Sequence, residues 1–260
     1  MKTAILAIVC LTLHIPTARA AVQTKTVDYE YDGTKLKGFL AWDDAVTGKR
    51  PGVLVVHEFW GLNDYARGRA EQLAKLGYVA FACDMYGEGK TTEHPKEAGE
   101  MAAKVRMNVE TWRKRAEVAL DTLKAQPQCD KTKLAAIGCC FGGSTALQLA
   151  YSGADLKAVA TFHAALPTPT EEEAKKIKAT LLICHGGADT FIPEMAVKNF
   201  RAALDKAGVK YEFVSYPGAT HSFTVPDADK KGVAGIKYDK KADEDSWTKM
   251  KELFKEKLGK

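Results

Sequence analysis

A cysteine framed by glycines near the middle of the chain constrains the fold more than any other feature. Residues 134–139 form an apolar run of strand length, and the pattern Gly-x-Cys-x-Gly, with Cys140 at its centre, leads into a helix-like run of small and apolar residues. A strand that turns directly into a helix strains the backbone, and side chains at Gly138 and Gly142 would collide with the neighbouring strand and helix. The N-terminus of that helix directs free N–H groups and a positive dipole end at Cys140.

Strands and helices are expected to alternate along the rest of the chain. Two alternating segments around Asp32-Gly33 predict an antiparallel hairpin at a sheet edge. Continuous apolar runs, interspersed with helical patterns, predict buried strands at residues 53–56, 78–83, 134–139, 156–162, 180–184 and 211–216. Together these patterns predict one α/β domain at residues 21–260, with a doubly wound, mostly parallel sheet and an N-terminal antiparallel hairpin.

The first 20 residues differ from the rest of the chain. Lys2 precedes an apolar stretch at residues 4–13, and Ala18-Arg19-Ala20 forms a small-x-small cleavage site. The apolar stretch is too short to span a bilayer as an ordinary transmembrane helix. We therefore expect a signal peptide at residues 1–20 and an exported protein, periplasmic or secreted, with no membrane attachment after cleavage.

Charge and cysteine content limit the partners of the mature chain. Removal of Lys2 and Arg19 with the signal peptide lowers the net charge from +5 to +3, which is too small and too evenly spread to indicate nucleic acid binding. An odd number of cysteines in an exported protein predicts at least one free thiol, and their spacing matches no zinc pattern. We expect a monomer without metal or cofactor. The five cysteines are Cys83, Cys129, Cys139, Cys140 and Cys184.

Residues capable of acid, base and nucleophilic chemistry follow several of the predicted strands. Glu58 follows the first buried strand, and Asp189 and His221 follow the last two. Because the carboxyl ends of parallel strands meet at one edge of a sheet, we expect these side chains near Cys140. His221 can accept the thiol proton and return it to a leaving group, and Asp189 would hold the imidazole in the required tautomer. The order nucleophile, acid, histidine is typical of one large hydrolase fold.

An oxyanion hole requires two backbone N–H groups near the nucleophile. One is expected from Phe141, the residue after Cys140. The second is expected from the loop after the first buried strand, where Phe59 is the candidate and Trp60 lies one position away.

Five motifs follow one another along the mature chain: Val-His-Glu-Phe-Trp-Gly at 56–61, Cys-Asp-Met-Tyr-Gly at 83–87, Gly-Cys-Cys-Phe-Gly-Gly at 138–143, His-Gly-Gly-Ala-Asp at 185–189 and Ala-Thr-His-Ser-Phe at 219–223. Together they resemble the dienelactone hydrolase (carboxymethylenebutenolidase) family over nearly all of the mature chain. The resemblance implies an α/β-hydrolase fold, no cofactor and a triad of Cys140, His221 and Asp189. It also implies that Glu58 keeps the resting thiol protonated and turned aside until substrate arrives.

The sequence departs from this family at the groups that hold the substrate carboxylate. The family places one arginine just after its Asp-x-Tyr motif and one four residues after the catalytic histidine. This chain has only Lys90 near the first position and Val225 at the second. Ester or lactone hydrolysis is still expected, with aromatic residues indicating an apolar or planar acyl group. The residues expected to bind substrate are Trp60, Tyr86, Lys90, His163 and Phe223.

Two hypotheses of function follow. The first is a hydrolase of a lactone or small carboxylic ester, in which Cys140 forms an acyl-thioester that is cleaved by water activated by His221. The alternative is a non-catalytic binding protein or a thiol redox protein on the same fold, using Cys139 and Cys140. A disulfide between adjacent cysteines closes a strained eight-membered ring, and the side chains of Cys139 and Cys140 are expected to point in opposite directions. The sequence therefore favours the hydrolase.

Overall fold

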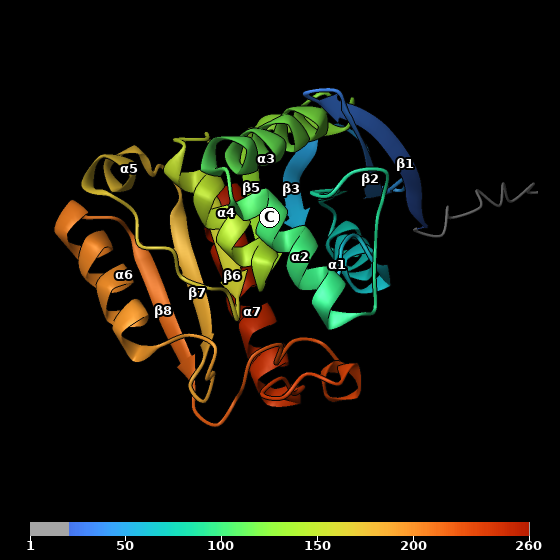
Figure 1. Cartoon of the computed structure of the whole chain (residues 1–260). Helices are drawn as coiled ribbons and strands as arrows, with labels where there is room; N and C mark the ends of the chain where they lie inside the picture. The colour runs from blue at the N-terminus through green and yellow to red at the C-terminus, as the bar shows by residue number, and fades with distance from the viewer. Residues whose placement is uncertain (1–20, 260) are drawn as a thin grey trace, which may run out of the picture.

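The computed structural model describes residues 21–259, so the predicted signal peptide at residues 1–20 lies outside the described residues. Its eight strands form one sheet in the order β1-β2-β4-β3-β5-β6-β7-β8 (Figure 1). The strands are β1 (Val22–Tyr31), β2 (Thr34–Asp43), β3 (Arg50–Val56), β4 (Val79–Cys83), β5 (Cys129–Cys139), β6 (Ala158–Phe162), β7 (Thr180–Gly186) and β8 (Tyr211–Tyr216).

The helices lie between the strands in sequence, as predicted. They are α1 (Asp64–Lys75), α2 (Pro95–Arg106), α3 (Val109–Lys124), α4 (Phe141–Tyr151), α5 (Glu171–Lys176), α6 (Glu194–Ala207) and α7 (Lys240–Leu258), with a short 3-10 helix at Ala228–Lys231. Within residues 21–259, none of these helices has both the length and the apolar character needed to cross a membrane.

The strand pairing confirms the predicted doubly wound, mostly parallel sheet. β1 and β2 form the antiparallel hairpin at one edge, and Asp32 and Gly33 at its turn have φ values of 48° and 68°. Positive φ at both central residues is what a two-residue hairpin turn requires. β2 also pairs antiparallel with β4, whereas the strands from β4 to β8 pair in parallel.

Helices cover both faces of the sheet because its central strands are apolar on both sides. Along β3, Leu54 and Val56 belong to the core under α2, α3, α4 and α6. The alternating residues Val53 and Val55 belong to the core under α1 and α7. Figure 1 shows the first group of helices in front of the sheet and α7 behind it. The carboxyl ends of the parallel strands therefore open onto one rim between the two helical layers.

β5 is longer than its apolar run predicted. The strand begins at Cys129, and its first residues pair with Arg50 and Pro51 before the register shifts. Residues 131–133 are exposed, so this half of the strand lacks the apolar pattern from which residues 134–139 were recognised. The buried half ends at the glycine-framed turn before α4.

Candidate active site

Cys140 lies on the sharp turn between β5 and α4, with φ 51° and ψ −116°. Such a conformation is strained for a non-glycine residue and persists only where the surrounding structure enforces it. A Cβ atom on Gly138 would overlap the carbonyl of Gly142, and one on Gly142 would overlap the carbonyl of Val56. The predicted need for glycine at both positions is confirmed. The turn presents the Cys140 side chain, half-buried, at the N-terminus of α4.

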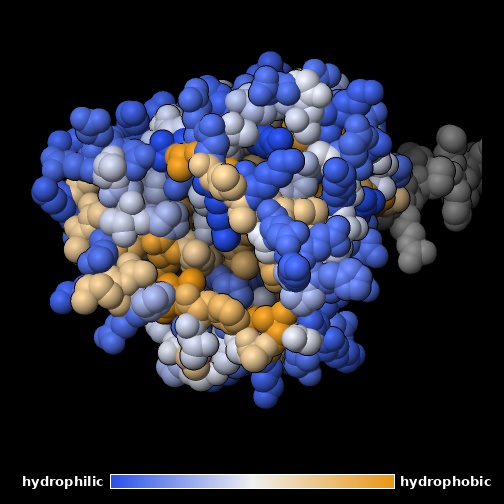
Figure 2. All heavy atoms as spheres, in the orientation of Figure 1, coloured by the Kyte–Doolittle hydropathy of each residue, from blue (hydrophilic) through white to orange (hydrophobic). Residues whose placement is uncertain are grey.

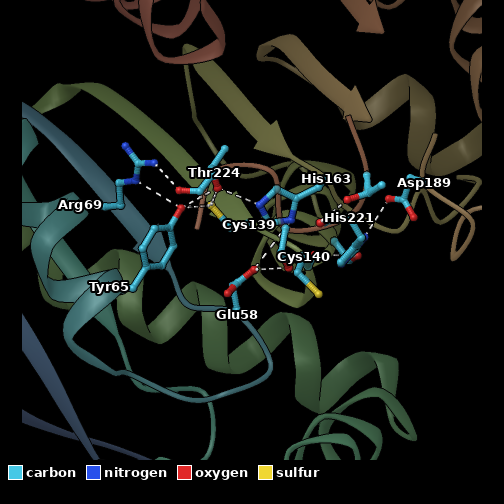
Figure 3. A network of polar contacts seen from close by, with 12 residues as sticks. Glu58, Tyr65, Arg69, Cys139, Cys140, His163, Asp189, His221 and Thr224 are labelled. Carbon is cyan, nitrogen blue, oxygen red and sulfur yellow. Dashed lines mark hydrogen bonds and ion pairs between the residues drawn. The ribbon is translucent and has the colours of Figure 1, made fainter. Parts of the chain in front are cut away.

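His221 and Asp189 form a buried pair. Nδ1 of His221 is 2.7 Å from Oδ2 of Asp189, whose other oxygen accepts the backbone N–H of Phe191 at 2.9 Å. Burial alone would lower the pKa of His221. The electrostatic attraction of the Cys140 sulfur and the hydrogen bond with Asp189 outweigh it and raise that pKa to about 10. The structure thus brings Cys140, His221 and Asp189 together from three strand ends (Figure 3).

Glu58 is a buried carboxyl group on the other side of the nucleophile (Figure 3). Ser222 Oγ donates a long hydrogen bond of 3.4 Å to its Oε1, and Nδ1 of His163 is 3.8 Å from the same oxygen. Burial raises the pKa of Glu58 to about 7, although His221 and the Ser222 hydroxyl oppose the shift. Glu58 can therefore hold or release a proton near neutral pH.

The two backbone N–H groups expected to bind an oxyanion belong to different segments, the start of α4 and the loop after β3. Phe141 is the first residue of α4, so its N–H precedes the intrahelical hydrogen bonds. The N–H of Phe59 has no acceptor among the described residues, and its carbonyl accepts the hydroxyl of Tyr86 at 2.9 Å. This hydrogen bond from Tyr86 fixes the orientation of the peptide group between Phe59 and Trp60.

A cavity of about 450 Å³ opens directly at Cys140. Figure 2 shows a hollow on this face of the molecule, bordered by hydrophobic residues. Apart from Arg106, Cys140, His221 and Ser222, its lining is apolar. Its residues are Phe59, Pro95, Gly99, Ala102, Arg106, Cys140, Ala165, Phe191, Ile192, His221, Ser222, Val233 and Ile236.

The five residues expected to bind substrate do not contribute to this lining. His163 and Phe223 are fully buried, and Trp60 is buried against Phe59 with ring centroids 4.2 Å apart. Tyr86 is half-buried and points its hydroxyl at the backbone. Lys90 is exposed outside the cavity. Trp60, Tyr86 and Phe223 were expected to bind substrate, and the structure places all three outside the lining of the cavity.

The sequence-based prediction did not identify Arg106 or Ser222. Arg106 ends α2, lines the cavity and lies over the ring of Phe141 at 5.1 Å. Its side chain makes no ion pair within residues 21–259. Ser222 follows His221 and has φ 56°, a strained value for serine. Its position in the fifth motif was the signal available, whereas nothing in the sequence shows which face of α2 borders the cavity.

Comparisons with known proteins show one family and one fold. The model of the dienelactone hydrolase family matches residues 36–258. A candidate carboxymethylenebutenolidase of Synechocystis sp. is 30% identical over 253 residues, which cover 91% of this chain and 98% of the relative. The solved structure of P91, a dienelactone hydrolase-like promiscuous phosphotriesterase from metagenomic libraries, has a TM-score of 0.89 and 39% identity, covering 92% of this chain and 99% of its own. The solved structure m3DLH has a TM-score of 0.89 and 42% identity with the same coverage.

Proposed function

The chain belongs to the dienelactone hydrolase family of α/β hydrolases, and from this membership we propose that it cleaves a lactone or small carboxylic ester through Cys140, His221 and Asp189. One observation carries the proposal. The strained turn presents Cys140 at the cavity, beside a histidine whose Nδ1 is held 2.7 Å from a buried carboxylate. A sulfur, a base and an orienting acid in this arrangement are the parts that nucleophilic acyl transfer needs.

The first half of the reaction forms an acyl-thioester. A His221 pKa near 10 favours the imidazolium at neutral pH, and an imidazolium beside the sulfur stabilises its thiolate. The thiolate attacks the carbonyl carbon, and the N–H groups of Phe59 and Phe141 receive the oxyanion. The carbon–oxygen bond of the ester then breaks, and His221 gives its proton to the departing alkoxide.

The second half restores the enzyme. His221, now neutral, accepts a proton from water as that water attacks the thioester carbonyl. The carbon–sulfur bond breaks, the acid product leaves, and the imidazolium and thiolate are formed again. Asp189 holds Nδ1 throughout, so Nε2 remains directed at the reacting groups.

After turnover, a protonated Glu58 can give its proton to the Cys140 thiolate, which leaves a thiol beside an ionised carboxyl group until substrate arrives. Its pKa of about 7 allows it to return a proton to the sulfur, which protects the thiol while no substrate is bound. This role is the one that family resemblance implies. The burial of the carboxyl group supports it, because a solvated loop glutamate would stay ionised at neutral pH.

The cavity indicates the kind of substrate. Its wall of aliphatic and aromatic residues fits an apolar acyl group. Arg106 provides a cation at the cavity of a chain that lacks the family's two arginines. Arginine holds a carboxylate in a bidentate fork, which Lys90 cannot do. We therefore propose a neutral or singly anionic ester or lactone with an apolar acyl part. A neutral phosphotriester is a second candidate, because P91, 39% identical to this chain, is described as a phosphotriesterase.

The redox alternative finds less support. Both cysteines of the adjacent pair are free thiols, and only Cys140 reaches the cavity. Sγ of Cys139 faces the opposite side of the turn, 3.5 Å from the hydroxyl of Tyr65. Burial raises the pKa of the Cys139 thiol to about 12, so it remains protonated and unreactive.

Trapping of the acyl-enzyme tests the proposal. The protein is mixed with an activated aryl ester, quenched in acid and digested, and we expect an acyl group on Cys140 by mass spectrometry. Cys139→Ala is the matched control and should acylate normally, because its sulfur takes no part. Full turnover of the ester by Cys140→Ala would overturn the proposal. A panel of lactones, carboxylated esters and a neutral phosphotriester then ranks the substrate classes.

A further inference from the structure

A buried chain of hydrogen bonds lies directly behind the active site and takes no part in the reaction steps above. It runs from Arg69 through Tyr65 and Thr224 to His163, which faces Glu58 (Figure 3). The first two residues lie on α1, Thr224 lies in the loop after β8, and His163 directly follows β6. We refer to Arg69, Tyr65 and Thr224 as the α1 relay.

Arg69 fixes the direction of the hydrogen bonds, because a guanidinium can only donate. Its Nε donates to the Tyr65 hydroxyl at 3.2 Å, and Nη1 donates to Oε1 of Gln72 at 3.0 Å. Nη2 donates to the carbonyl of Thr224 at 3.0 Å and to Oδ1 of Asp243 at 2.6 Å. Four bonds to a buried side chain leave Arg69 a single orientation.

The remaining hydrogens of the relay follow in order. The Tyr65 oxygen accepts from Arg69, and its own hydrogen has two acceptors within reach, Thr224 Oγ1 at 2.6 Å and the sulfur of Cys139 at 3.5 Å. We assign this hydrogen to Thr224, the closer and stronger acceptor. Thr224 then gives its only hydroxyl hydrogen to Nε2 of His163 at 2.8 Å. A neutral imidazole that accepts at Nε2 carries its hydrogen on Nδ1.

Nδ1 of His163 is aimed at Glu58. This atom is buried, has no hydrogen-bond partner among the described residues, and is 3.8 Å from Oε1 of Glu58. A movement of about 1 Å by the carboxyl group brings it to hydrogen-bond distance. Burial, then the positive charges of His221 and Arg69, lower the pKa of His163 well below its ordinary value, so the ring is neutral. Its φ of 41° is strained, as at sites where the surroundings impose a side-chain position.

We propose that the α1 relay holds His163 as its Nδ1–H tautomer and that this N–H stabilises the ionised form of Glu58 beside Cys140. His163 is thus a positioning residue that acts through Glu58 and does not touch substrate. The inference deepens the proposed function and rests on the role of Glu58 in it. Its test needs no turnover, so a protein without esterase activity would not by itself contradict the inference.

Other groups also face Glu58 and must be held constant in any test. The side chains of His221, Arg69 and Lys231 favour its ionised form through their positive charge, and Ser222 does so through its hydrogen bond. Cys139 and Tyr65 are neutral near pH 7, because burial raises both of their pKa values. Pairs of variants at a single relay position, which differ from each other by one atom or one methylene group, leave the charges of these other groups unchanged.

The tautomer of His163 can be determined by NMR in the unmodified protein. Nitrogen NMR of histidine-labelled protein should show a neutral His163 ring with a protonated Nδ1 and a bare Nε2 between pH 5 and pH 9. Tyr65→Phe removes the hydrogen that Thr224 receives, so the Nε2–H form should appear, whereas Thr224→Ser keeps the hydroxyl and should preserve the parent signals. A ring protonated at Nε2 in the parent protein would overturn the proposal.

A second experiment measures how the nitrogen facing Glu58 changes the pKa of that carboxyl group. In His163→Asn the amide nitrogen takes the place of Nδ1, and in His163→Gln it takes the place of Nε2. Carbon NMR of labelled glutamate should show the titration midpoint of Glu58 raised by about one pH unit in the Gln variant, the worth of one hydrogen bond to a charged group. The Asn variant should stay near the parent value. Equal midpoints in the two variants would contradict the proposal. If neither variant folds, Tyr65→Phe provides the test: it should raise the titration midpoint of Glu58, and an unchanged midpoint would contradict the proposal.

Discussion

The buried carboxyl group of Glu58 predicts a pH-dependent loss of stability that Glu58→Gln should abolish. Burial raises its pKa from an ordinary value of 4.5 to about 7 in the folded protein. The folded state therefore binds this proton more tightly than the unfolded state does. The stabilisation is complete below pH 4.5 and is lost as the pH rises through 7, where the folded protein must hold a buried carboxylate.

The size of the effect follows from the shift. Each pKa unit is worth about 1.4 kcal/mol, so the free energy of unfolding should fall by about 2.5 kcal/mol between pH 5 and pH 8.5 on account of this group. Glu58 is only 3% exposed, so solvent screening removes little of that amount. Glutamine has nearly the same shape but no charge, and its contribution is independent of pH in this range.

Urea unfolding of the two proteins at a series of pH values, under reducing conditions, measures the effect. The stability of Glu58→Gln relative to the parent should increase by about 2.5 kcal/mol from pH 5 to pH 8.5. Glu252→Gln, at an exposed position of α7, is the control and should follow the parent at every pH. A difference between Glu58→Gln and the parent that stays constant with pH, within about 0.5 kcal/mol, would refute the reasoning.

Four further predictions concern the rest of the site. Iodoacetamide should label Cys140 alone in the folded protein, because the other described thiols are buried, and peptide mapping checks this. Asp189→Asn should reduce kcat by roughly 10³-fold or more, because the ring of His221 loses its orienting acceptor; steady-state kinetics at fixed pH measure it. Arg106→Gln should raise KM for a carboxylated ester by about tenfold while leaving that for its neutral analogue nearly unchanged, and equal changes for both would contradict its role. Gly142→Ala should destabilise the protein by several kcal/mol or prevent folding, because the new methyl group overlaps the Val56 carbonyl; urea unfolding decides it.

The sheet and the positions of Cys140, Asp189 and His221 could be predicted because local patterns determine them. A buried parallel strand needs a continuous apolar run, and the residue after such a run stands at the rim of the sheet. This placed Cys140, Asp189 and His221 after three parallel strands, β5, β7 and β8, at the same edge of the sheet, where the structure also has them. The glycines of the turn were predictable for the same reason, since their steric requirement is local.

The cavity wall and the α1 relay could not be predicted in this way. Aromatic composition indicates apolar contact but not which side of a wall the ring occupies, so Phe223 was expected in the cavity and lies fully buried behind it. Tyr65 and Arg69 form an ordinary pair one turn apart on α1. Their partner Thr224 is 159 residues away from Tyr65 along the chain, and only tertiary packing brings the two together.

Only one of the segments that line the cavity on two sides of Cys140 is separate from the residues proposed for the chemistry. Pro95, Gly99 and Arg106 lie on α2, which carries none of those residues, whereas Val233 and Ile236 lie in the connection between β8 and α7 that also carries His221. Substitutions on α2 can therefore change the lining of the cavity while the sulfur, imidazole and carboxylate keep their places. The scaffold separates the choice of molecule from the chemistry performed on it, which makes this face a favourable starting point for directed changes of selectivity.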